Sequence, residues 1–263
     1  MNPIPICYND NLYKKGICKY ICWDPHKQAH MAVSGGTGSG KTVFTKVILY
    51  SIVRNVPNAM IYCLDFKGDT DFSFLDGYKH YYRFDAVKTG FDDFYNELEN
   101  RQKALGTVNR PIFTLFDEWA SFIFWLDKKE AEAYKQKLAN ILMLGRSFDM
   151  HVILSQQRLD AETFGKGGAR DNLGLVAILG TISKEAAGMI FSGFKEEIEP
   201  DRERSTGYML VDGSRFYSIR VPFVRDMEGF NGRLREMMAG CLPLQADEGE
   251  GEGEAEREPK PNA

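Results

Sequence analysis

An eight-residue segment, GGTGSGKT, constrains the fold of this chain more than any other feature of the sequence. It has the spacing Gly, four residues, Gly-Lys-Thr, and it lies between the apolar run HMAVSG (30–35) and a helical pattern (41–54). Small residues at this position allow backbone amides to curl around phosphate oxygens, and the following helix presents its positive end to them. A glycine-rich turn with an incidental lysine would not need this strand–loop–helix context. The predicted phosphate-binding residues are Gly35, Gly36, Thr37, Gly38, Ser39, Gly40, Lys41 and Thr42.

Two of these side chains have expected roles of their own. Lys41 is predicted to reach the β- and γ-phosphates of ATP, and Thr42 is predicted to bind Mg²⁺. ATP and Mg²⁺ are therefore the expected cofactors.

The other strand candidates are continuous apolar runs, which are typical of strands buried on both faces. They are AMIYCLD (59–65), IFTLFD (112–117), HVILSQ (151–156) and LVAILG (175–180). Helical patterns at 91–105, 128–146 and 184–191 alternate with them, which predicts an α/β fold whose mainly parallel central sheet is flanked by helices. A hairpin of strands 207–212 and 215–223 is expected at the edge of this sheet, followed by a helix at 230–238.

Charge is unevenly distributed along the chain. The net charge is −4, but residues 247–263 alone hold seven acidic and two basic side chains, so the rest of the chain is close to neutral. A near-neutral body excludes binding of nucleic acid through a strong overall field, and any such contact requires a local basic surface or a ring of subunits. We expect a strand-containing lead-in (1–24), one ATPase domain (25–243) and a disordered acidic tail (244–263).

Cysteine usage and hydropathy indicate a cytoplasmic protein. The five cysteines are an odd number, and no secretory signal precedes them. A zinc site is the alternative for Cys7, Cys18 and Cys22 with the nearby histidines, but their spacing lacks compact ligand pairs, so ordinary thiols are the preferred interpretation. No stretch reaches the roughly 18 to 20 apolar residues of a membrane span. We therefore expect no membrane span in this chain.

An acidic pair lies at the end of the predicted strand 112–117. Since this strand ends at the carboxyl edge of the sheet, Asp117 is expected to complete the Mg²⁺ shell and Glu118 to polarise the attacking water as a general base. The alternative is that both acids favour the start of a helix at Trp119 through its dipole. Glu118 is the residue that would make the chain an ATPase instead of a nucleotide-binding protein.

Three further residues are candidates for catalysis. Gln157 follows the strand 151–156, where its amide is expected to hydrogen-bond the attacking water or the γ-phosphate. Arg146 and Arg170 are candidates for the positive charge that the transition state needs, supplied from a neighbouring subunit. A surface salt bridge or a charge at a helix end is the alternative for each arginine.

In these residues the chain resembles the motor domain of the FtsK/SpoIIIE-type DNA translocases, within the additional-strand, RecA-like P-loop NTPases. The resemblance covers Pro25 to Arg225. The matching segments are AHMAVSGGTGSGKT, YCLDFKG, LFDEW, GRSFDMHVILSQQR, ARDNLGLVAILG and GYMLVDGSRFYSIRVPFV. Gln157-Arg158 matches the family's Gln-Arg pair, and Asp65 with Lys67 matches its Asp-x-Lys strand end.

The RDN triplet (170–172) and the glycine-bearing hairpin look most like the conjugative coupling-protein branch of Gram-positive mobile elements. The chain departs from the family at Leu159, where proline is frequent, and at Leu175-Val176, where an arginine is expected. The position of the arginine that acts on a neighbouring subunit is therefore open.

The resemblance implies a ring, expected to be a hexamer, with ATP at subunit boundaries and DNA in a central channel. Lys67, Lys166 and Arg170 are then candidates for DNA contacts. The expected function is ATP-driven translocation or coupling of DNA in conjugative transfer, with a relaxase and a separately encoded membrane channel as partners. Two alternatives stay open: an ATP-switched adaptor that docks a relaxase or replication complex on a channel, and a phage DNA-packaging or partition ATPase.

Overall fold

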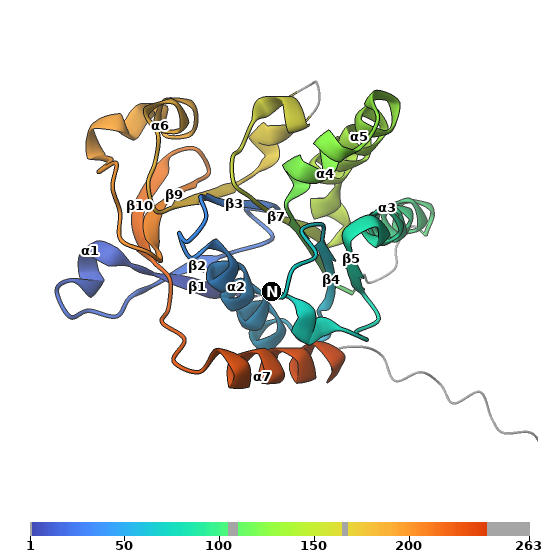
Figure 1. The fold of residues 1–263 in the computed structure, drawn as a ribbon, viewed down its shortest axis with the longest axis horizontal. Coiled ribbons are helices and arrows are strands. Elements are labelled where there is room, and N and C mark those ends of the chain that lie inside the picture. The colour runs from blue at the N-terminus through green and yellow to red at the C-terminus, as the bar shows by residue number, and fades with distance from the viewer. Residues whose placement is uncertain (1, 105–109, 165–167, 241–263) are drawn as a thin grey trace, which may run out of the picture.

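A computed structural model of the chain describes residues 2–104, 110–164 and 168–240 (Figure 1). Ten strands in these residues form one sheet, in the order β2-β1-β10-β9-β8-β3-β7-β6-β4-β5. Strands β8 to β5 in this order are mutually parallel, and β9, β10, β1 and β2 continue the sheet in antiparallel pairing. The predicted α/β class with a mainly parallel sheet is confirmed.

The bounds of the strands follow the chain. They are β1 (Ile4–Asn9), β2 (Tyr20–Trp23), β3 (Met31–Gly35), β4 (Met60–Asp65), β5 (Tyr81–Arg83), β6 (Ile112–Asp117), β7 (Met150–Gln156), β8 (Leu175–Leu179), β9 (Thr206–Val211) and β10 (Arg215–Arg220). The helices are α1 (Asp10–Tyr13), α2 (Lys41–Asn55), α3 (Val87–Lys103), α4 (Trp119–Trp125), α5 (Lys128–Leu144), α6 (Lys184–Ile190) and α7 (Met227–Gly240). Residues 105, 166 and the predicted acidic tail (244–263) lie outside the described residues.

Two hydrophobic cores lie on opposite faces of the sheet. Successive side chains of a strand point to opposite faces, so Val33 of β3 packs in the core that α2 and α7 cover. Its neighbour Ala32 packs in the core that α3, α4 and α5 cover. The central strands are buried along their whole length, which is why their sequences are continuous apolar runs without alternation.

The predicted hairpin is present as β9 and β10, but its position at the sheet edge is wrong. Strand β1 pairs with β10, with Tyr8 opposite Arg220, and β2 pairs with β1 to form the actual edge. Strand β1 is not predicted as a separate element because Pro3, just before it, and Pro5, within it, argue against a strand in the sequence. Proline is tolerated in a sheet only near an edge or at an irregularity. The pairing of β1 with β2 indeed shifts its register between Pro5 and Cys7.

The topology gathers four strand ends at one edge of the sheet. Strands β8, β3, β7 and β6 are adjacent and parallel, so their carboxyl ends lie together, at the edge where ligands bind in open α/β sheets. In the described part of the chain, no helix is both long enough and apolar enough to span a membrane.

Candidate functional site

The segment from Gly35 to Thr42 forms the loop that joins β3 to α2. Gly38 and Gly40 have φ of 81° and 97°, in the left-handed region that favours glycine. Gly40 also allows a close approach, because a Cβ atom on it would lie 3.1 Å from the Cα atom of Ser205. Helix α2 begins at Lys41, so its free amide groups face the loop and provide the positive end that a phosphate needs.

Three elements of the fold meet at the amino group of Lys41. Its Nζ donates to Glu118 Oε1 over 2.8 Å and to Ser155 Oγ over 3.3 Å, and it lies 3.5 Å from Asp117 Oδ1. The lysine comes from α2, the acids from the end of β6 and the serine from β7. Only 11% of the Lys41 side chain is exposed, so this charge cluster is shielded from solvent. A buried cation held on two carboxylates can be transferred to the phosphates of an incoming nucleotide.

Burial sets the protonation of Asp117. It raises the pKa of this carboxyl to about 6, although the charge of Lys41 and a hydrogen bond from Ser155 oppose the rise. The Ser155 hydroxyl donates to Asp117 Oδ1 over 2.5 Å. This bond fixes one oxygen of the carboxylate in the core of the site.

Glu118 has an unusual backbone conformation. Its φ of 62° and ψ of 47° lie in the left-handed region, which costs a non-glycine residue about 1–2 kcal/mol. Its amide donates to the Ser155 carbonyl over 2.6 Å, and helix α4 begins at the next residue, Trp119. The Glu118 side chain makes no capping bond to that helix and points to Lys41 instead. The other oxygen, Glu118 Oε2, accepts a hydrogen bond of 3.4 Å from the Ser121 hydroxyl, so the carboxylate also contacts the first turn of α4. Backbone strain of this kind is typical of functional positions.

Thr42 and the acids around it suit a magnesium ion. The Thr42 hydroxyl donates to Asp71 Oδ2 over 3.3 Å, and Thr42, Asp71 and Asp117 line one cavity. Among the residues that the structure describes, no group of three or more His, Cys, Asp or Glu side chains could hold a metal by itself. Mg²⁺ is usually held by one or two carboxylates together with substrate phosphates and water, so this oxygen donor set fits it.

The cavity around these residues has a volume of about 490 Å³, which is within the range of ligand pockets. Gln157 lines it, and its main-chain carbonyl accepts a hydrogen bond of 2.9 Å from the Ser34 hydroxyl. Lys67 also lines the cavity and forms ion pairs with Asp69 and Asp71. The structure thus places one candidate for a DNA contact, Lys67, beside the phosphate loop.

The structure does not bring the two candidate arginines to the phosphate loop of their own chain. Arg146 is exposed in a 3-10 helix (Gly145–Phe148) directly before β7, and Arg170 is half-buried in another (Ala169–Asn172) directly before β8. Both precede their strands, so they lie at the amino-terminal edge of the sheet, opposite the phosphate loop. Arg158, which follows Gln157, is exposed.

Sequence reasoning missed a segment that contacts the phosphate loop from far along the chain, since Ser205 lies 166 residues after its partner Ser39. Ser205 donates its amide to the Ser39 carbonyl over 2.8 Å and accepts a bond of 2.8 Å from the Val221 amide. The preceding residue, Arg204, is exposed and lines the cavity. Such a distant partner leaves no local pattern. By contrast, Asp71 stands in the acidic segment DFKGDTD after β4, and that cluster was an available signal.

A buried ionic cluster anchors this segment. Asp10 of α1 is fully buried and accepts hydrogen bonds of 2.7 Å from both Arg202 and Arg220. Arg202 also donates to Ser218 of β10 over 2.8 Å. The segment that holds Arg204 is thereby fixed to α1 and β10.

A sequence model of the FtsK/SpoIIIE family matches residues 11–105. The FtsK domain-containing protein YdcQ of Bacillus subtilis (strain 168) is 28% identical over 271 residues, which cover 92% of this chain and 53% of that protein. The chain thus spans about half the length of this curated relative.

Solved structures share the fold. The cytoplasmic domain of the type VII secretion ATPase EccC of Thermomonospora curvata is 19% identical with a TM-score of 0.66, over 90% of this chain and 31% of that one. The pCW3 conjugation coupling protein TcpA, in a monomer form with ATPγS, is 20% identical with a TM-score of 0.68, over 83% of this chain and 67% of that one. Over residues 11–105 the chain is thus similar to the FtsK/SpoIIIE family, and its fold is that of the RecA-like P-loop ATPases.

Proposed function

We propose that this chain hydrolyses ATP to move or couple DNA in the conjugative transfer of a mobile element. The observation that carries the proposal is the meeting of Lys41, Asp117 and Glu118 at the end of the phosphate loop, which is the set of groups that ATP hydrolysis needs. The name of TcpA, a conjugation coupling protein with the same fold, supports the choice of conjugation.

The residues of the chain divide the work of hydrolysis. The amides of the phosphate loop hold the phosphate oxygens, and Lys41 moves from Glu118 to the β- and γ-phosphates as ATP enters. In the structure, Glu118 Oε1 accepts a hydrogen bond of 2.8 Å from Lys41. Once Lys41 has moved, this oxygen is free to accept a proton from the attacking water. Gln157, on the wall of the same cavity, orients that water. Lys41 thus holds the proposed base, Glu118, in an ion pair until ATP binds.

Magnesium would be held by Thr42 and Asp117, with Asp71 in reach of Thr42. When bound, it neutralises the charge that develops on the transferred phosphoryl group. Asp117 has to be ionised for this role, and Ser155 keeps its carboxylate in place.

We further propose that the protein works in the cytoplasm as a ring, with a hexamer as the expected number of subunits. Arg146 and Arg170 lie away from the phosphate loop of their own chain, which supports a role toward a neighbouring subunit or toward DNA. A ring multiplies every phosphate contact of a near-neutral protomer. A relaxase and a membrane channel encoded elsewhere are the proposed partners.

ATP turnover with and without single- and double-stranded DNA, at two salt concentrations, tests this proposal. Salt-sensitive stimulation of the purified chain by either DNA, lost in Lys41→Ala, is the expected result. ATP binding without stimulation by DNA, under conditions where rings form, would favour the ATP-switched adaptor. If genes for a capsid or a partition system lie beside the gene for this chain, DNA packaging or partition would replace conjugation as the proposed process.

A further inference from the structure

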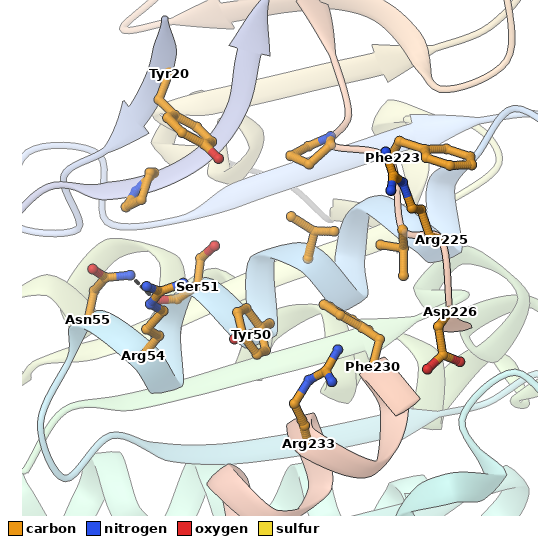
Figure 2. Close-up of a pocket in the computed structure, with 14 residues that line it drawn as sticks. Tyr20, Tyr50, Ser51, Arg54, Asn55, Phe223, Arg225, Asp226, Phe230 and Arg233 are labelled. Atoms are coloured by element: carbon orange, nitrogen blue, oxygen red, sulfur yellow. Dashed lines mark hydrogen bonds between the residues drawn. The ribbon is translucent and has the colours of Figure 1, made fainter. Parts of the chain in front are cut away.

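A groove of about 700 Å³ is lined by α2, α7, strands β1 and β2, and the segment that joins β10 to α7 (Figure 2). Tyr50 and Phe230, whose rings lie 5.1 Å apart, form an aromatic wall of this groove, and the half-exposed ring of Tyr20 lines it as well. None of the residues that line the groove also lines the phosphate cavity. The ATPase site therefore leaves this groove unused.

Positive charge dominates the walls of the groove. Arg54 in the last turn of α2, Arg225 before α7 and Arg233 on α7 are exposed, and Figure 2 shows them spread along the groove. Within the described residues, none of these three guanidinium groups forms an ion pair. The one acid in the lining, Asp226, accepts a hydrogen bond from the Gly229 amide at the start of α7. The groove suits a ligand that carries several negative charges.

The sequence of this chain contains such a ligand. Residues 247–256, DEGEGEGEAE, hold six acids and no base, and every second residue from Glu248 to Glu256 is a glutamate. Alternate side chains of an extended chain point to the same side, about 7 Å apart. Glycine or alanine occupies each position between these glutamates. An extended segment of this sequence would direct carboxylates at the arginines and would let its backbone approach the aromatic wall.

We propose that this acidic segment, residues 247–256, docks in the groove of its own chain. Helix α7 ends at Gly240, and Arg233 lies seven residues earlier, about 10 Å along the helix. Residues 241–246 can span up to about 20 Å, so Asp247 is able to reach Arg233. A tether of this length gives the acidic segment an effective concentration on the order of millimolar at the groove.

Docking withholds the three arginines from other polyanions. A nucleic acid that binds this groove first has to displace a segment that is always present at high effective concentration. The interaction is electrostatic and exposed, so added salt weakens it. The inference does not depend on the proposed ATP hydrolysis, because the groove and the phosphate cavity share no lining residue.

The test uses the full-length chain and a fluorescent synthetic peptide with the sequence of residues 247–256. In a tail variant of unchanged length, Asp247→Asn is combined with glutamine at each of the five glutamate positions from 248 to 256. Fluorescence anisotropy measures binding of the peptide. The peptide should bind the tail variant, and it should bind the wild-type chain at least about tenfold more weakly, because the native segment competes for the groove. A peptide with the same neutral replacements should bind neither chain.

Removal of the arginines tests where the peptide binds. Arg54→Gln, Arg225→Gln and Arg233→Gln, added together to the tail variant, should weaken peptide binding roughly 3- to 150-fold, as expected for three exposed ion pairs.

The matched control removes three exposed lysines that line neither the groove nor the phosphate cavity. Its changes are Lys103→Gln, Lys129→Gln and Lys184→Gln. This control should change the affinity of the tail variant for the peptide by less than twofold.

Three results would overturn the proposal. Equal affinity of the peptide for the wild-type chain and the tail variant would show that the native segment does not occupy the groove. Equal effects of the arginine and lysine changes would show that the peptide binds elsewhere. If the peptide binds neither chain, but double-stranded DNA binds the tail variant and the arginine changes weaken that binding, the groove is a surface for nucleic acid instead.

Discussion

Replacement of Asp10 by asparagine tests how the segment of Arg204 is held in place. Asp10 is fully buried, and its two oxygens accept hydrogen bonds of 2.7 Å from Arg220 and Arg202. The side chain of Arg202 is only 5% exposed. Asparagine keeps the shape but removes the charge and turns an NH₂ group toward one of the arginines. Breaking a buried ion pair from one side costs about 3–5 kcal/mol when the remaining charge stays buried without a partner. Arg202 keeps its ion pair with the exposed Glu199, so the lower end of this range is expected.

The expected change in melting temperature follows from this cost. A domain of this size loses about 2–4 °C per kcal/mol, so a loss of about 3 kcal/mol lowers the melting temperature by roughly 6–12 °C. Glu132→Gln is the matched control: its carboxylate pairs with Lys135 over 3.0 Å but is 57% exposed, so the expected loss is below about 1 kcal/mol. Thermal unfolding followed by circular dichroism measures both. A shift for Asp10→Asn no larger than that of the control would refute the reasoning.

Acid titration provides a second readout of the same variant. Burial raises the pKa of Asp10, but hydrogen bonds and charges from Arg220 and Lys14 outweigh it, so the pKa lies below its ordinary value. A carboxyl with a lowered folded pKa contributes stability above its unfolded pKa of about 4 and loses that contribution as the pH falls through the folded pKa. The difference in unfolding free energy between wild type and Asp10→Asn should therefore shrink below pH about 4. A difference that stays constant into acid would contradict this assignment.

Three further predictions concern the site itself. Gly40→Ala should weaken ATP binding at least about tenfold and lower the unfolding free energy by about 1–2 kcal/mol, because the new Cβ atom would clash with Ser205 and because φ at this position is positive. Gly232→Ala is the control: its new Cβ atom has no neighbour within 4 Å, so this variant should bind ATP normally. ATP turnover should fall as the pH drops through about 6, because Asp117 must be ionised to bind magnesium. A tenfold rise in magnesium concentration should lower the midpoint pH of this fall by up to about one unit. A midpoint pH that does not depend on magnesium would exclude protonation of Asp117 as the cause of the fall. Glu118→Gly should be about 1 kcal/mol more stable than Glu118→Ala in chemical denaturation, since only the alanine keeps a strained φ of 62°; equal stabilities would show that the strain is absent.

The central strands and the phosphate loop could be predicted because their signals are local. Continuous apolar runs marked β3, β4, β6, β7 and β8 within one or two residues, and the strand–loop–helix context located the loop. The sheet edge could not be predicted in the same way. Strand β1 contains proline, and β5 has only three residues, Tyr81–Arg83, so neither forms a recognisable run.

Within the site, the sequence indicated residues that end strands and missed those that arrive from elsewhere. Asp117 ends a predicted strand, and Glu118 and Gln157 directly follow predicted strands, so parallel topology alone brings them to one edge. Arg204 and its neighbour Ser205 reach the phosphate loop because Asp10, distant in sequence, fixes their segment. Contacts of this kind depend on tertiary packing, which no local pattern encodes.

The direct test of the central claim is ATP binding and single-turnover hydrolysis by the wild-type chain and Glu118→Gln, measured side by side. Because Glu118 is proposed as the base and Lys41 with the phosphate loop as the binding elements, the variant should bind ATP at least as tightly as wild type and hydrolyse it at least about 100-fold more slowly. Hydrolysis by Glu118→Gln at the wild-type rate would contradict the assignment of Glu118 and, with it, this account of the catalytic site.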